Sequence, residues 1–299
     1  MCLGRGDDFV INIGFTISGL KSSAILSVSA RVEELGFGCV WVGEHLIFPA
    51  EMPATYPYSA SGRPPVNPES PLFDPFVVLS FAAAATKKIK LGTGVYILPL
   101  RNPFVTARAV TTLDRLSEGR VIFGVGAGWL REEFQAVGEN WENRFKRTRE
   151  IVEVMKRLWT EDTIQHTGQY YSFDAVKFQP KPVQKPHPPI EFGGVTKASL
   201  RRAAELGDGW ISAGRFEPED VAKVSEEIRR YRREFGKTGP FNITCLCAVE
   251  PTPENMRRYE EAGATRVYLR PPLSWNSRNL EGDFHLFLEH TYDTLLSKL

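Results

Sequence analysis

Residues 113–129 read LDRLSEGRVIFGVGAGW and join the end of a helix to a strand. The helix predicted from Asn102 runs to about Leu116 and stops at Gly119, because glycine is the residue type that most often follows a helix end. The short apolar run from Val121 to Val125 is typical of a strand that is buried on both faces. The segment therefore predicts one α/β unit of a parallel sheet.

The same unit recurs along the whole chain, with amphipathic helices between short apolar runs. Eight runs are predicted to be strands, and they are Val10–Ile17, Phe37–Val42, Ile89–Leu98, Val121–Val125, Pro189–Phe192, Gly209–Ser212, Phe241–Val249 and Thr265–Leu269. Eight units over 299 residues favour a closed (β/α)8 barrel, the TIM-barrel architecture, over an open sheet. No linker rich in Ser, Gly or Pro divides the units, so we expect one domain over residues 1–299.

Two stretches interrupt this alternation. Residues 46–73 are rich in Pro, Tyr and Ser and follow the second predicted strand. This places them at the carboxyl-terminal end of a barrel, where barrel active sites lie, and predicts an active-site loop. Residues 163–188 combine a small predicted hairpin with a Pro-rich connection, and we interpret them as an insertion before the fifth strand.

Composition excludes several classes of function. Lys and Arg number 37 against 36 Asp and Glu, a balance that argues against sequence-independent binding of nucleic acid. No apolar run approaches the roughly 18 residues of a membrane span. The four cysteines lack the spacing of a zinc site or a disulfide framework, and no other metal motif is present. We expect a cytoplasmic enzyme that acts on a small molecule without a metal.

Glu44 and His45 come directly after the second predicted strand and before the long loop. Histidine carries protons near neutral pH, and a carboxylate beside it is a common arrangement in acid–base catalysis. This position predicts a catalytic pair, the alternative being a structural histidine. The two residues are adjacent, so they reach one site only if the strand has already ended there.

Glycines gather at two predicted strand ends. Gly124, Gly126 and Gly128 form G-x-G-x-G, but Trp129 stands near the place where a dinucleotide fingerprint needs its last glycine. These glycines either let a flat ligand approach the backbone or form a tight turn. The sequence thus argues against a nicotinamide site of the Rossmann type.

Gly193, Gly194 and Thr196 lead into the helix predicted from Ala198. Free backbone N–H groups at a glycine-rich helix start suit a phosphate. Arg215 and Phe216 follow the sixth predicted strand, and Arg270 ends the eighth. The two arginines are candidates for binding an anionic substrate, or are solvated charges at the rim.

Four motifs together resemble the bacterial luciferase-like monooxygenase superfamily: WVGEH (41–45), LGTGVYILPLRNP (91–103), the 113–129 segment and LGDGWIS (206–212). Within it, the chain is most similar to the oxidoreductases that depend on coenzyme F420, a deazaflavin. The resemblance implies a barrel with an insertion before strand five, hydride transfer between F420 and a small organic substrate, and a homodimer. A reduced-FMN monooxygenase and a non-catalytic barrel that binds a phosphorylated ligand remain the alternatives.

The resemblance also assigns roles to residues. It places Glu44 and His45 beside the reactive ring and Gly94-Val95 at a peptide that is often cis and supports the ring. Cofactor contacts are implied for Thr16, Gly94, Val95, Ala127, Gly128, Gly193, Gly194, Thr196, Ala198 and Ser199. Substrate contacts are expected from Trp129, Arg215, Phe216 and Arg270.

Two departures from the family narrow the expected substrate. In its sugar-phosphate dehydrogenases a glutamate follows the glycines of the fourth strand, and this chain has Trp129 there. Their substrate-phosphate lysine after strand six has no lysine counterpart, since Arg215 and Phe216 occupy that place. We therefore expect a flatter or more apolar substrate, covered by the 46–73 loop.

Overall fold

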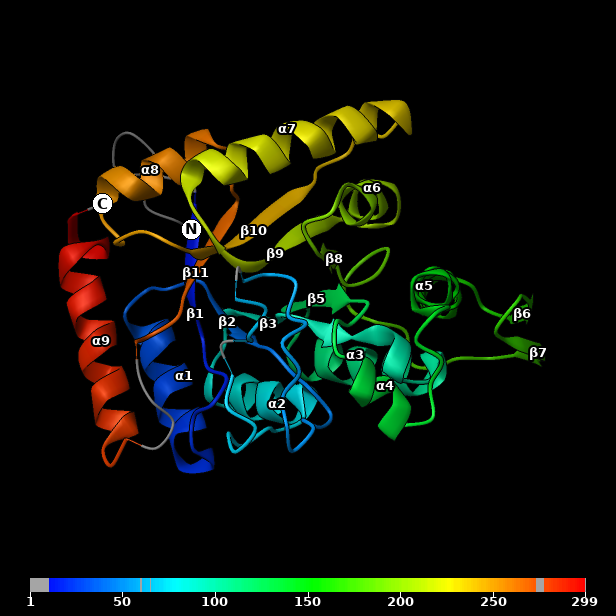
Figure 1. Cartoon of the computed structure of the whole chain (residues 1–299), viewed down its shortest axis with the longest axis horizontal. Coiled ribbons are helices and arrows are strands. Elements are labelled where there is room, and N and C mark those ends of the chain that lie inside the picture. Colours follow the sequence, from blue (N-terminus) through cyan, green and yellow to red (C-terminus); the bar gives the residue numbers. More distant parts are fainter. Residues whose placement is uncertain (1–10, 60, 65, 273–276, 299) are drawn as a thin grey trace.

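The computed structural model describes residues 11–59, 61–64, 66–272 and 277–298, and it forms a closed parallel barrel (Figure 1). The barrel strands are β1 (Asn12–Thr16), β2 (Cys39–Val42), β3 (Lys90–Thr93), β5 (Val121–Gly126), β8 (Ile190–Gly193), β9 (Gly209–Phe216), β10 (Asn242–Cys247) and β11 (Arg266–Leu269). The ring closes because β1 pairs with β11 and β3 pairs with β5, all in parallel. The predicted (β/α)8 barrel is therefore confirmed. Val10, predicted to start the first strand, lies outside the described residues.

Two strands depart furthest from their predicted bounds. The third predicted strand is divided into β3 and β4 (Tyr96–Ile97), with a cis peptide bond between Gly94 and Val95. The sixth strand extends to Phe216, because β9 resumes its pairing with β10 after an irregularity in register and aligns Arg215 with Leu246. Arg215 and Phe216 thus lie within a strand rather than after it.

Helices surround the barrel on its outer side (Figure 1). They are α1 (Ile25–Glu34), α2 (Pro75–Ala85), α3 (Pro103–Leu116), α4 (Arg131–Ala136), α5 (Arg144–Thr160), α6 (Lys197–Leu206), α7 (Pro218–Glu234), α8 (Pro253–Glu261) and α9 (Leu280–Thr294), with 3-10 turns at Ser22–Ala24, Leu98–Leu100 and Leu296–Lys298. Asp74 and Asn102 cap α2 and α3, each followed by a proline at the first helical position. No helix in the described ranges is long and apolar enough to cross a membrane.

Alternate strand residues fill the barrel, because successive side chains point to opposite faces of a sheet. Trp41, Ile211 and Tyr268 belong to the cluster inside the ring, whereas Phe192 and Trp210 belong to the larger cluster that packs under the helices. Large buried rings leave little free space within the barrel, so a ligand site is expected at the strand ends.

Residues 163–188 contain the antiparallel pair β6 (Ile164–Thr167) and β7 (Ser172–Val176), which projects beyond α5 (Figure 1). Glu150 of α5 holds the turn: its carboxylate accepts hydrogen bonds from the N–H groups of Tyr170 and Tyr171 and lies 3.3 Å from His166 Nε2. His166 therefore has a structural role away from the strand ends.

Candidate active site

Glu44 lies just past the end of β2 and turns into the protein. Its Oε1 accepts hydrogen bonds from the Ile97 N–H at 2.7 Å and from Arg101 Nη1 at 2.6 Å, and Oε2 pairs with the other Arg101 nitrogen. The Glu44 side chain is only 2% exposed. Burial raises the pKa of Glu44 to about 7, with Arg101 and the Ile97 N–H acting in the opposite direction. Glu44 thus changes its charge near neutral pH.

His45 points to a different carboxylate. Its Nδ1 lies 3.0 Å from Oε2 of Glu133 in α4, whose other oxygen accepts the Leu46 N–H at 2.5 Å. The Glu133 side chain is fully buried. Because a carboxylate only accepts hydrogen bonds, we assign the proton to Nδ1, which leaves the Nε2 lone pair available. Among the described residues, Nε2 of His45 has no hydrogen-bond partner.

Aromatic rings connect His45 to the 46–73 loop. The Trp129 ring lies edge-on to His45 at 5.6 Å between centroids and edge-on to Tyr56 at 4.9 Å. Tyr56 in turn contacts Tyr58 at 5.2 Å. Burial raises the pKa of Tyr56, and the positive charge of exposed Arg270 opposes that rise. The loop therefore lies over the side of the barrel end that carries His45.

The glycines of two strand ends surround one side chain. A Cβ atom at Gly126 would lie 2.7 Å from Val95 Cγ2, and one at Gly193 would lie 3.1 Å from Val95 Cγ1. Gly128 has a positive φ of 80°, and a Cβ there would lie 2.7 Å from the Phe134 ring. Contacts within the chain therefore restrict all three positions to glycine, and Gly126 and Gly193 flank Val95 of the cis Gly94-Val95 peptide that the resemblance implies.

The start of α6 offers unused backbone donors. Thr196 caps the helix, with its Oγ1 accepting the Ser199 N–H at 3.2 Å, and Gly194 has φ 122°. In the described part of the chain, the N–H groups of Lys197 and Ala198 donate no hydrogen bond, and both residues are exposed. A helix start with free N–H groups and a favourable dipole fits a phosphate.

The remaining candidates are spread out. Thr16, at the end of β1, is buried and donates to Ser18, which accepts the Gly43 N–H. Arg215 is exposed and donates to the Cys247 carbonyl at 3.0 Å. The Phe216 ring packs against Trp210, in the cluster under the outer helices.

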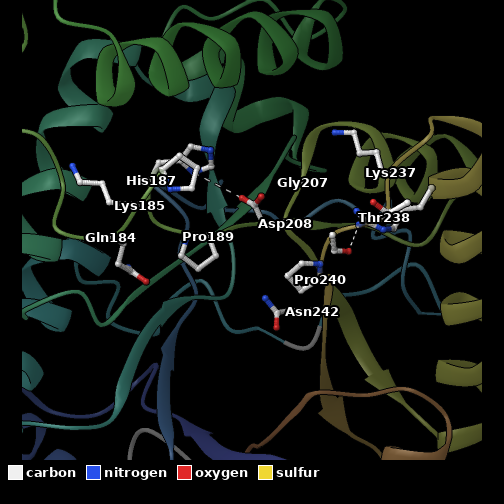
Figure 2. A pocket seen from close by; sticks show the side chains of 13 residues that line it. Gln184, Lys185, His187, Pro189, Gly207, Asp208, Lys237, Thr238, Pro240 and Asn242 are labelled. Atoms are coloured by element: carbon white, nitrogen blue, oxygen red, sulfur yellow. Dashed lines mark hydrogen bonds and ion pairs between the residues drawn. The ribbon is translucent and has the colours of Figure 1, made fainter.

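A cavity of about 500 Å³ lies at the other end of the barrel, near the amino-terminal ends of β8 and β10 (Figure 2). Asp208 lines it and accepts the Ile190 N–H at 2.9 Å, while Arg232 donates to the Gly239 carbonyl at 2.6 Å. These charged groups therefore stabilise the loops that precede the strands. Barrel chemistry belongs to the opposite end, so we do not assign the candidate site to this cavity.

Two side chains that contact Glu44 and His45 were not among the candidates predicted from the sequence. Arg101 lies inside the motif LGTGVYILPLRNP, and Glu133 lies in the first turn of α4. An acidic residue that begins the helix after a glycine-rich strand end was the available signal for Glu133. Within the described residues, no cluster of His, Cys, Asp and Glu could hold a metal ion.

Several known proteins are similar to this chain in sequence. An uncharacterized protein of Mycobacterium tuberculosis is 32% identical over 250 residues, covering 82% of this chain and 86% of that protein. An F420-dependent glucose-6-phosphate dehydrogenase of Amycolatopsis mediterranei is 32% identical, covering 64% of this chain and 56% of that one. An FMNH(2)-dependent dimethylsulfone monooxygenase of Pseudomonas putida is 29% identical, covering 58% and 48%.

Solved structures share the fold. The monooxygenase RslO1 from Streptomyces bottropensis matches with a TM-score of 0.75 at 20% identity, covering 96% of this chain and 99% of that one. An F420-dependent secondary alcohol dehydrogenase, solved with an F420–acetone adduct, matches with a TM-score of 0.72 at 21% identity, covering 94% and 98%. Residues 16–291 match the family of luciferase-like monooxygenases. The chain therefore belongs to the luciferase-like monooxygenase family, whose members use either F420 or reduced FMN.

Proposed function

We propose that this protein is an F420-dependent oxidoreductase that moves a hydride between the cofactor and a small organic alcohol or carbonyl compound. The observation that carries the proposal is the His45–Glu133 pair, with Nδ1 and Oε2 3.0 Å apart at the carboxyl-terminal end of the barrel. A hydride that leaves the C–H bond of an alcohol leaves a proton on its oxygen. Such a reaction needs a base, and His45 supplies one.

Bound F420 supplies a ring carbon that accepts or releases the hydride. His45 Nε2 takes the hydroxyl proton as the carbonyl forms, or returns it in the reverse direction. Glu133 positions the His45 ring by accepting the hydrogen bond of its Nδ1–H group. The amides of Lys197 and Ala198 bind the cofactor phosphate, and Trp129 with Tyr56 covers the substrate and excludes water.

We propose that Glu44 and Arg101 lie on the side of the cofactor ring opposite His45. Their ion pair is anchored to the Ile97 N–H, just after the cis Gly94-Val95 peptide. Because Glu44 titrates near pH 7, the pair also adjusts the charge beside the ring. We propose that this charge control is the role of Glu44, whereas His45 carries the proton.

A reduced-FMN monooxygenase is the second candidate. The helix start at Thr196 would accept the phosphate of FMN as well as that of F420, and the relative from Pseudomonas putida uses FMNH(2). The phosphate site alone therefore does not discriminate between the two cofactors.

Titration of the cofactor-free protein with each cofactor tests the proposal. We expect the fluorescence of F420 to change to a saturating end point at micromolar concentrations, on the order of 10⁻⁶ M. FMN, oxidised or reduced, is expected to bind much more weakly. Saturable FMN binding without F420 binding would contradict the proposal and support a reduced-FMN monooxygenase.

We also propose that the protein forms a homodimer through α2 and α3. Val77 and Phe81 lie one turn apart on α2 and are 58% and 50% exposed, and Val105 of the neighbouring α3 is 65% exposed. Apolar side chains gathered on two adjacent helices favour an interface.

Phe81→Asp is expected to convert the dimer to a monomer, and light scattering measures the mass. Leu286→Asp on α9, 69% exposed, is the matched control and should leave the mass unchanged.

A further inference from the structure

Two arginines of neighbouring helices lie over the same aromatic ring. Arg144 begins α5, Arg202 belongs to α6, and their guanidinium carbons lie 4.0 Å and 4.7 Å from the centroid of the Phe145 ring. Arg144 also lies 3.5 Å from the centroid of the Trp141 ring. Stacking on aromatic faces fixes the plane of a guanidinium group and orients its donors.

Neither arginine forms an ion pair within the described residues, although the charges of Glu142 and Glu205 act on Arg144 and Arg202 from nearby. Within the described ranges, Arg202 forms no hydrogen bond and no ion pair, and Arg144 donates only to the Trp141 carbonyl, with a buried Nε that has no partner. The nearby Glu205 is engaged by Arg149 through bonds of 2.7 Å and 2.6 Å. Burial lowers the pKa of Arg202, and the charges of Arg149 and Arg144 lower it further.

Arg202 belongs to the helix whose start forms the proposed phosphate site, and Arg144 shares the Phe145 ring with it. Arg202 follows Ala198 by one helical turn, and side chains on a helix lean towards its amino-terminal end. Arg202 therefore leans towards the free N–H groups at the start of α6. Arg144 faces the 46–73 loop, since its charge acts on the pKa of Tyr58, which burial raises.

We infer that Arg144 and Arg202 bind a carboxylate-bearing chain that continues from the cofactor beyond its phosphate. This inference rests on the proposed function. F420 continues past its phosphate as a chain of glutamyl residues with free carboxylates, whereas FMN ends at its phosphate. Each guanidinium group can donate two parallel hydrogen bonds to one carboxylate. Two guanidinium groups over the same ring can therefore bind successive carboxylates of one chain.

Binding measurements with two forms of the cofactor test this assignment. The protein is titrated, by fluorescence at low salt, with F420 carrying several glutamates and with the same deazaflavin phosphate without glutamates. We expect the glutamylated form to bind about tenfold more tightly, from two partly exposed charge pairs. This difference should shrink as salt is added, because exposed charges are screened.

Substitutions test whether Arg144 and Arg202 cause the difference in affinity between the two cofactor forms. Arg202→Ala and Arg144→Ala should each remove much of the difference between the two forms, while the form without glutamates keeps its affinity. Arg202→Lys keeps the positive charge and should retain part of the difference in affinity. This result would show that the loss in Arg202→Ala comes from the charge and not from misfolding. Arg201→Ala is the matched control, since Arg201 is its neighbour on α6 and pairs with Glu234 at 2.7 Å.

The outcomes separate the inference from the proposed function. Equal binding of both forms by the unaltered protein would overturn the inference and leave F420 binding intact. An equal loss in Arg201→Ala and Arg202→Ala would also overturn it. If neither form binds, the proposed function fails, and the inference fails with it.

Discussion

Replacing His45 by Gln lowers turnover by about 10²–10⁴-fold, the usual contribution of a positioned acid–base group. The substitution keeps a polar side chain near Glu133 but removes the Nε2 base, so cofactor binding is expected to persist. The measurement is the single-turnover loss of the visible absorbance of F420, with a substrate selected by screening small alcohols. Unchanged turnover in His45→Gln would exclude the proposed role.

Glu133→Gln separates positioning from proton transfer. The amide oxygen of Gln can still accept the Leu46 N–H, but its amide nitrogen would donate to Nδ1 and force the proton onto Nε2 of His45. We expect a loss of about 10²-fold or more and an altered pH profile of turnover. A merely structural role would lower the melting temperature and leave the shape of the profile unchanged. Glu142→Gln, a side chain 72% exposed, is the control.

The second large effect is on stability. Through Glu44, we expect the free energy of unfolding to fall as pH rises from about 4.5 to 7. Burial raises the pKa of folded Glu44 to about 7, against 4.5 for an unperturbed carboxyl. Between these values the folded state binds more protons than the unfolded state, so stability decreases with rising pH. At about 1.4 kcal/mol for each pH unit, the decrease amounts to about 3 kcal/mol.

Glu44→Gln tests this expectation because it cannot ionise and still accepts the Ile97 N–H. Urea denaturation at a series of pH values gives the free energy of unfolding of both proteins. The difference between the unaltered protein and Glu44→Gln should change by about 3 kcal/mol across this window. Parallel curves would contradict the buried titration of Glu44. Glu142→Gln, on the exposed surface, should run parallel to the unaltered protein.

The sequence predicted the barrel because each of its units is encoded locally. Segment 113–129 contains its own helix stop and its own buried strand, and α3 begins after Asn102 as predicted. The places where the prediction failed depend on pairing with distant strands. The extension of β9 to Phe216 requires β10, and the division at Gly94-Val95 is not visible in an apolar run.

In the candidate site, too, local sequence signals predicted some residues, and contacts between distant residues decided the others. Position after a strand selected Glu44 and His45, and the glycine-rich helix start selected Thr196, since both signals are short-range. Arg101 and Glu133 are 57 and 88 residues from their partners, so no local pattern pairs them. Only the tertiary structure brought each carboxylate to its cation or imidazole, because closing the barrel is what gathers all strand ends at one edge. By itself the sequence determined the architecture and the chemistry-bearing residue types, and folding decided which of them touch.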